Sequence, residues 1–105
     1  MTTVEEPDGP VQIVMIADVP AADVAAFQEY ESRVLPLMAR HGGRLERRVR
    51  SLDAQVEVHL ISFDTRSGLE AAMVDPERLA SRRLLDGAGI VQRIHHVTDV
   101  AADQA

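Results

Sequence analysis

The chain has 105 residues, of which 46% are hydrophobic and 27% charged, and its formal net charge is −6. This length accommodates one domain, and a domain this small gains stability when a second copy covers part of its surface. The negative charge argues against a nucleic-acid partner, which rewards clustered cations. Because cysteine is absent, disulfides, a thiolate nucleophile and cysteine metal sites are excluded.

The sequence also lacks signals for a membrane. No apolar run approaches the ~20 residues of a membrane span, and the N-terminus lacks the basic-then-apolar order of a signal peptide. We therefore expect a cytoplasmic protein without a membrane partner. One Tyr, two Phe and no Trp offer little aromatic surface for stacking nucleobases or a planar cofactor.

The first half of the chain predicts strand, helix, strand. Residues 1–10 (MTTVEEPDGP) are rich in acids, proline and glycine and predict a flexible tail, followed by a single domain over 11–100. Residues 11–19 are almost entirely apolar, as in a strand covered on both faces. A helix is expected over 21–41, because one stripe at three- and four-residue steps contains Val24, Phe27, Glu31, Val34, Leu35 and Met38. Glu31 is its one polar member.

Local signals set the limits of this helix and of the next strands. Pro36 should bend the helix or leave a carbonyl unpaired. His41 is interpreted as a structural residue, favoured at the helix end by the helix dipole. Gly42-Gly43 should end the helix in the left-handed conformation. Residues 44–52 alternate imperfectly and are highly charged, which suits the edge of a sheet. After a turn at 53–55, the apolar residues 56–63 predict a central strand.

The second half repeats the helix–strand order. Ser67-Gly68-Leu69-Glu70 matches a capping box at the start of a helix. The helix should pause at Asp75-Pro76, where Asp caps and Pro takes the first helical position, and then continue to the glycines at 87 and 89. Residues 90–100, polar at nearly every other position, predict the last strand, and residues 101–105 a frayed C-terminus.

The resulting β-α-β-β-α-β order predicts a ferredoxin-like α+β domain, an antiparallel four-stranded sheet with two helices on one face. The first and third strands are central in this topology, and they are the two apolar ones. Both faces of the strand 11–19 are apolar: one carries Ile13 and Met15, and the other Val14 and Ile16. Since the helices cover one face only, we expect a homodimer in which two sheets close face to face.

With this order established, the chain resembles the dimeric α/β-barrel superfamily, and within it an uncharacterised family of small proteins with a helix–Gly-Gly-Arg–strand signature. The resemblance covers about 11–100, and the matching residues are Tyr30, Pro36, Leu37, HGGRLERR at 41–48 and ISFDTRSGLEAAMVDPERLASRRLL at 61–85. It implies a dimeric α/β barrel with a ligand pocket between sheet and helices. It implies no single reaction, because the superfamily includes monooxygenases, isomerases, cyclases, haem-degrading enzymes and members without a known reaction.

The chain departs from three of these mechanisms. Quinone-forming and haem-degrading barrels rely on a tryptophan that is absent here. Plant-type polyketide cyclases carry a tyrosine and a histidine on the second helix, where this sequence has Ala72 and Arg78. None of these mechanisms is carried over.

His59 is the main candidate for chemistry, because histidine moves protons at neutral pH. It lies in the middle of the central strand 56–63, on the same face as Glu57, Ile61 and Phe63. Two interpretations are open: a hydrogen-bonded core or interface residue, or an acid/base in a pocket. A cavity near ~300 Å³ beside His59 would favour the second.

Other candidates surround it. Tyr30 either contacts a ligand between helix and sheet or is a packed ring with its hydroxyl in water. Arg48, with its neighbouring arginines, either binds a carboxylate or phosphate or is part of a solvated edge strand. His95 and His96 point to opposite faces of a strand, and His96 and Phe63 are further candidate substrate-binding residues.

The sequence contains no metal motif, glycine-rich phosphate loop or nucleophile elbow, so we expect neither metal nor cofactor. The leading hypothesis is a cofactor-independent acid/base enzyme of isomerase, cyclase or lyase type, acting on a small organic acid or polyketide-like intermediate. His59 would be the acid/base, with Tyr30 and Arg48 orienting the substrate. The alternative is a non-catalytic dimeric binding or accessory protein whose pocket is filled by its own side chains.

Overall fold

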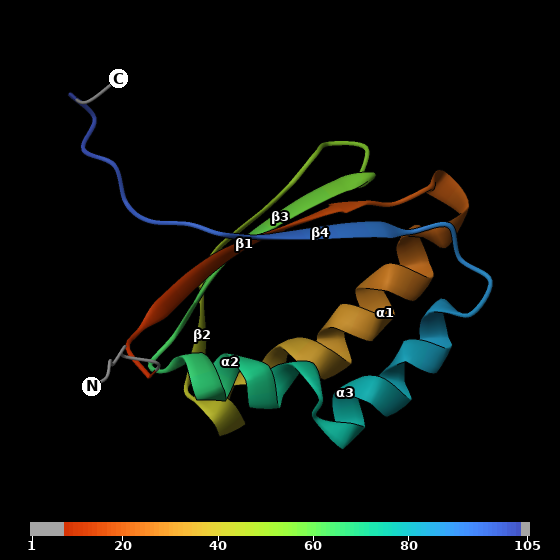
Figure 1. Cartoon of the computed structure of the whole chain (residues 1–105). Helices are drawn as coiled ribbons and strands as arrows, with labels where there is room; N and C mark the ends of the chain where they lie inside the picture. The colour runs from red at the N-terminus through yellow and green to blue at the C-terminus, as the bar shows by residue number, and fades with distance from the viewer. Residues whose placement is uncertain (1–7, 104–105) are drawn as a thin grey trace.

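The computed structural model describes residues 8–103. Four strands, β1 (Val11–Asp18), β2 (Gly43–Arg50), β3 (Val56–Phe63) and β4 (Val91–His96), form one sheet in the order β2-β3-β1-β4. Every neighbouring pair is antiparallel. The helices α1 (Val24–Val34), α2 (Arg66–Met73) and α3 (Pro76–Ser81) lie on one face of this sheet (Figure 1). The predicted ferredoxin-like fold is therefore confirmed, with the apolar strands β1 and β3 at the centre.

The helical region predicted over 21–41 consists of three segments. A 3₁₀ turn, η1 (Ala21–Asp23), precedes α1, and a longer 3₁₀ segment, η2 (Leu35–His41), follows it. The change occurs next to Pro36, which has no N–H for the α-helical ladder and whose ring crowds the preceding turn. Gly42 then ends the segment in the left-handed region, with φ 77°, as expected for a glycine stop.

The start of the second helical region differs from the predicted one. The N-cap of α2 is Thr65, whose Oγ1 accepts a hydrogen bond from the N–H of Gly68 at 3.0 Å. The capping box predicted at Ser67 is wrong, because Thr65 has the extended backbone of a cap whereas Ser67 lies inside the first turn. The second cap is confirmed: Asp75 accepts from the N–H of Glu77 at 2.9 Å, and α3 begins with proline. A 3₁₀ segment, η3 (Arg82–Leu85), ends the region.

The last strand is shorter than predicted, ending at His96 instead of residue 100. Its final pairing partner in β1 is Ile13, and the N–H of Val97 still donates to the carbonyl of Gln12 at 3.0 Å. β1 begins at Val11, only two residues before Ile13, and the chain leaves the sheet after this last hydrogen bond (Figure 1). Of the predicted terminal tails, only residues 8–10 and 101–103 fall within the described chain.

The core between sheet and helices is divided into two clusters. One contains Ile13, Ile61, Phe63, Leu69 and Ala72, and the other Met15, Ala17, Val19, Phe27 and Tyr30. On the opposite face of the sheet, Val14, Ile16, Val58 and Leu60 are only half-buried. Within residues 8–103, no helix is long and apolar enough to span a membrane.

Candidate active site

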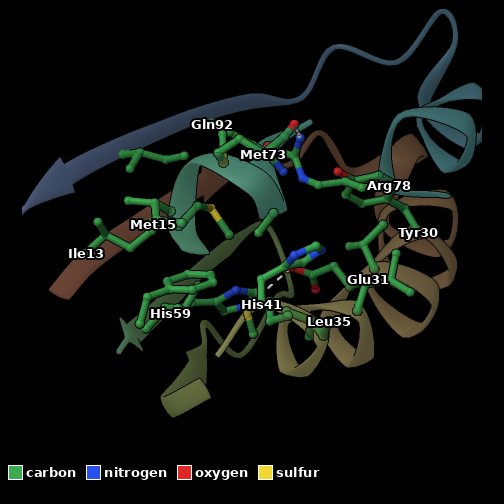
Figure 2. A pocket seen from close by; sticks show the side chains of 18 residues that line it. Ile13, Met15, Tyr30, Glu31, Leu35, His41, His59, Met73, Arg78 and Gln92 are labelled. Atoms are coloured by element: carbon green, nitrogen blue, oxygen red, sulfur yellow. Dashed lines mark hydrogen bonds and ion pairs between the residues drawn. The ribbon is translucent and has the colours of Figure 1, made fainter. Parts of the chain in front are cut away.

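A cavity of about 90 Å³ lies between the sheet and the helices (Figure 2). Its wall is mostly apolar, with Met15, Met38 and Met73 among the side chains that face it. The polar residues of its wall are Tyr30, Glu31, His41, His59, Arg78 and Gln92. The cavity is smaller than the ~300 Å³ of a typical small-molecule pocket, although methionine side chains adapt readily to a ligand.

His59 lies in the wall of this cavity and faces the helices. Its side chain is 2% exposed, and its Nε2 is 2.7 Å from Glu57 Oε2 and 3.2 Å from Glu31 Oε2. Glu57 precedes His59 by two residues on the same face of β3, and Glu31 reaches them from α1. We call these three buried side chains the Glu31–Glu57–His59 cluster.

Two arginines of the edge strand β2 neutralise this cluster. Arg48 donates from Nε to Glu57 at 2.7 Å and from Nη2 to Glu31 at 2.8 Å, and Arg50 donates from Nε to Glu57 at 2.7 Å. Arg48 is paired with His59 across the strands, and Arg50 with Glu57. Three of the four carboxylate oxygens of the cluster therefore accept an arginine N–H.

A β-bulge places these arginines on the helical side of the sheet. The register of β2 against β3 shifts between Leu45 and Arg47, where one extra residue enters β2. Before the bulge, odd-numbered residues of β2 share the face of Ile61; after it, the even-numbered Arg48 and Arg50 do so. The imperfect alternation of this strand in the sequence is the trace of the bulge.

The environment separates the proton affinities of the three groups. Burial raises the pKa of Glu31, and the neighbouring Glu57 adds to this effect while His59 opposes it. Burial alone would also raise the pKa of Glu57, but hydrogen bonds from Glu31, His59 and the two arginines outweigh it and hold that pKa well below the usual carboxyl range. Burial alone would lower the pKa of His59, but hydrogen bonds to both carboxyls outweigh it and raise the pKa.

The cluster can therefore hold and release a proton. Glu57 remains ionised as an anchor, whereas Glu31 and His59 both line the cavity and both have raised pKa values. Such a pair suits acid/base catalysis near neutral pH. A ligand atom from each of the three side chains also lies within 4.8 Å of the others. A divalent cation suits this site poorly, because the guanidinium groups already neutralise the carboxylates.

The predicted site residues divide into two groups. Tyr30 and Phe63 line the cavity together with His59, and the Tyr30 ring stacks on Phe27 with centroids 6.4 Å apart. Arg48 does not line the cavity, because its guanidinium is engaged by the cluster. His96 lies exposed at the end of β4, away from the cavity wall.

Sequence reasoning missed Glu31 and His41 as residues of the site. The signal for Glu31 was its place as a lone carboxylate in an apolar helical stripe. His41 lines the cavity, and its Nε2 is 2.7 Å from Oδ2 of the buried Asp75, which lowers the pKa of that carboxyl. No local pattern connects two residues 34 positions apart.

Known structures share this fold over almost the whole chain. A candidate antibiotic biosynthesis monooxygenase of Nitrosomonas europaea is similar with a TM-score of 0.71 and 16% identity, covering 94% of this chain and 98% of that one. SnoaB of Streptomyces nogalater, a cofactor-independent oxygenase, is similar with a TM-score of 0.68 and 18% identity, covering 90% and 98%.

A further candidate monooxygenase, from Bacteroides thetaiotaomicron, has a TM-score of 0.73 at 9% identity and covers 88% of this chain and 90% of that one. By sequence, the chain matches no protein-family model and no curated protein. The comparisons confirm the predicted resemblance at the level of the fold: this is a ferredoxin-like α+β domain like those of the antibiotic biosynthesis monooxygenase group.

Proposed function

We propose that the chain is a small-molecule enzyme that transfers protons without a cofactor. The observation that carries this proposal is the Glu31–Glu57–His59 cluster, of which Glu31 and His59 lie in the wall of an apolar cavity. Glu31 and His59 exchange the proton with the ligand, and Glu57, held by Arg48 and Arg50, keeps them in place. Tyr30, which precedes Glu31 on α1 and lines the same cavity, orients the ligand.

The chemistry that fits is proton removal from a carbon next to a carbonyl group, as in isomerases, cyclases and lyases acting on a small organic acid or a polyketide-like intermediate. A carboxyl group with a raised pKa serves this purpose, because it takes up a proton that an ordinary carboxylate would bind too weakly. SnoaB is a cofactor-independent oxygenase, and removal of a substrate proton is compatible with that chemistry also. Oxygen uptake would identify such a reaction.

Hydrogen–deuterium exchange at an activated carbon tests the proposal. We expect the wild-type chain to accelerate deuterium incorporation into acetoacetate or 2-oxobutyrate in D₂O, measured by proton NMR. Glu31→Gln and His59→Gln should each slow it by about 100-fold or more, the usual contribution of an acid/base group. The rate should rise with pH through and above the ordinary histidine range, because the raised pKa of His59 keeps it protonated at lower pH.

Glu29→Gln is the matched control for Glu31→Gln, since Glu29 lies on the same helix, is exposed, and pairs with Arg33 in solvent. Its exchange rate should equal the wild-type rate. A wild-type chain that exchanges no faster than buffer, or a Glu31→Gln variant with full activity, would contradict the proposed reaction.

The second candidate is a non-catalytic binding or accessory protein. The observation in its favour is the cavity volume of about 90 Å³, which is below the ~300 Å³ expected beside a catalytic His59. Ligand binding without any exchange activity would support this candidate over the enzyme.

We also propose that the chain works as a homodimer through the open face of the sheet. Ile16 and Val58 are cross-strand partners on that face, and a second copy would remove them from water. Sedimentation at micromolar concentration should give twice the chain mass of 11.5 kDa for the wild type and one chain mass for Val58→Lys. Val74→Lys, at a position directly after α2 that is 65% exposed, should remain dimeric. A monomeric wild type would overturn this assembly.

A further inference from the structure

A second, outer pocket adjoins the inner cavity. It has a volume of about 600 Å³ and lies between α1, the α3–η3 segment and β4. Five residues line both spaces: Tyr30, Met73, Arg78, Gln92 and Ile94. Because the two spaces share these walls, they adjoin each other at these five residues.

Arg78 is the charged residue at this junction. It is half-buried, and its Nη1 donates to the carbonyl of Met73 at 2.9 Å, which fixes the guanidinium. Within residues 8–103, no carboxylate lies within ion-pair distance of Arg78. Four other arginines of this part of the chain also lack a carboxylate partner, but all four are exposed: Arg47, Arg66, Arg82 and Arg83. A partly desolvated cation usually has a counter-charge, and here none comes from the described chain.

We propose that this junction binds the anionic group of a small organic monoacid, whose apolar part enters the inner cavity toward His59. This inference uses the cavity of the proposed function and names the class of its ligand. The guanidinium of Arg78, the phenol of Tyr30 and the amide of Gln92 supply hydrogen-bond donors. Figure 2 shows the Arg78 side chain extending toward Gln92, on the far side of the cavity from His59.

The charges around the junction favour a single negative charge. Arg82 lines the outer pocket and adds a second positive charge, whereas Asp86 in the same wall adds a negative one. The three charges of Arg78, Arg82 and Asp86 sum to +1, which suits a carboxylate better than a phosphate dianion. The wall of the inner cavity is mostly apolar, and the nearby Arg48 and Arg50 are already engaged by Glu31 and Glu57, so the ligand is oriented with its anionic group outward.

The inner cavity limits the apolar part of the ligand. At roughly 30 Å³ for each water-sized group, a volume of about 90 Å³ holds about three such groups. The ligand class is therefore a short-chain monocarboxylic acid, for which butyrate is a suitable probe.

Calorimetric and NMR titration of the full chain with butyrate, butanol and methylphosphonate tests the proposal. We expect butyrate to bind at least about tenfold more tightly than butanol, and more tightly than the dianion methylphosphonate. Arg78→Gln should weaken butyrate binding at least about tenfold without affecting butanol, and Arg78→Lys, which keeps the charge, should restore part of the affinity. Arg83→Gln, at an exposed position outside both pockets, should bind like the wild type.

Equal affinity for butyrate and butanol would overturn the proposal, as would tighter binding of methylphosphonate than of butyrate. An equal loss of butyrate affinity in Arg78→Gln and Arg83→Gln would overturn it also. The comparison among the three probes on the wild type needs no variant to fold. Failure of the proton-transfer proposal is recognised separately. If the wild type catalyses no deuterium exchange, the proposed reaction is overturned. If butyrate binding still depends on Arg78 and persists in Glu31→Gln, the monoacid site stands without that reaction.

Discussion

Glu57→Ala is expected to lower the free energy of unfolding by about 3–5 kcal/mol, the cost of removing one partner from a buried ion pair. The Glu57 side chain is 2% exposed and accepts hydrogen bonds from Arg48, Arg50 and His59. Without it, Arg50 loses its carboxylate partner and Arg48 keeps only Glu31, while the pKa of His59 loses one of the two carboxyl groups that raise it. Urea denaturation at pH 7, followed by circular dichroism, measures the change.

Glu46→Ala is the matched control, since Glu46 also lies in the sheet and pairs with an arginine, Arg44, but is 43% exposed. Exposed ion pairs contribute about 0–1 kcal/mol, so this variant should be nearly as stable as the wild type. Equal stability of the two variants would mean that the cluster is open to water and that its pKa shifts have another origin.

A buried network of this kind is unusual on the apolar face of a small domain. Apolar side chains of similar volume would stabilise the sheet at least as well as Glu57 and His59. The core is instead divided into two clusters, and the ionisable groups lie where the cavity opens between them. Perturbed titratable groups in a concave wall are typical of functional sites, which is why we assign the cluster a role in proton transfer.

The sequence predicted the features that depend on local periodicity. The two-residue period of β3 placed Glu57 and His59 on one face, and the helix period of α1 placed Glu31 in the buried stripe. The order of the elements placed β1 and β3 at the centre of the sheet, and the polarity of the four strands agreed with that placement. These properties depend on residues close in the sequence and on which face of a strand or helix is buried.

Features that depend on distant contacts were not predicted. The bulge in β2 reverses the direction of Arg48 only because β3 sets the register, and His41 meets Asp75 only after η2 and α3 have packed. Thr65 caps α2 because β3 ends just before it, a boundary that the sequence defines only to within a few residues. The arrangement of Arg78 at the junction of two pockets likewise requires the packed helices.

Gly68→Ala is the second substitution with a large expected effect. A Cβ at this position would lie 2.3 Å from the carbonyl oxygen of His41, a backbone atom that cannot swing aside, and 3.1 Å from Thr65 Oγ1. Alanine gains about 1 kcal/mol of helix propensity over glycine, but the overlap requires α2 to move away from η2. We expect a net loss of about 1–3 kcal/mol in the free energy of unfolding, as is usual for overpacked sites.

Gly89→Ala provides the comparison for this substitution. Its Cβ would lie 3.4 Å from Pro20 Cγ, an ordinary van der Waals distance, and the hydrogen bond from its N–H to Asp23 at 2.9 Å is retained. Urea denaturation should therefore show Gly89→Ala within about 0.5 kcal/mol of the wild type. Because Leu69, Ala72 and Met73 of α2 line the cavity, Gly68→Ala should also weaken butyrate binding while Gly89→Ala does not. Equal stability of the two variants would show that α2 is not packed tightly against the backbone of His41, and that this part of the cavity wall can move to accept the added methyl group.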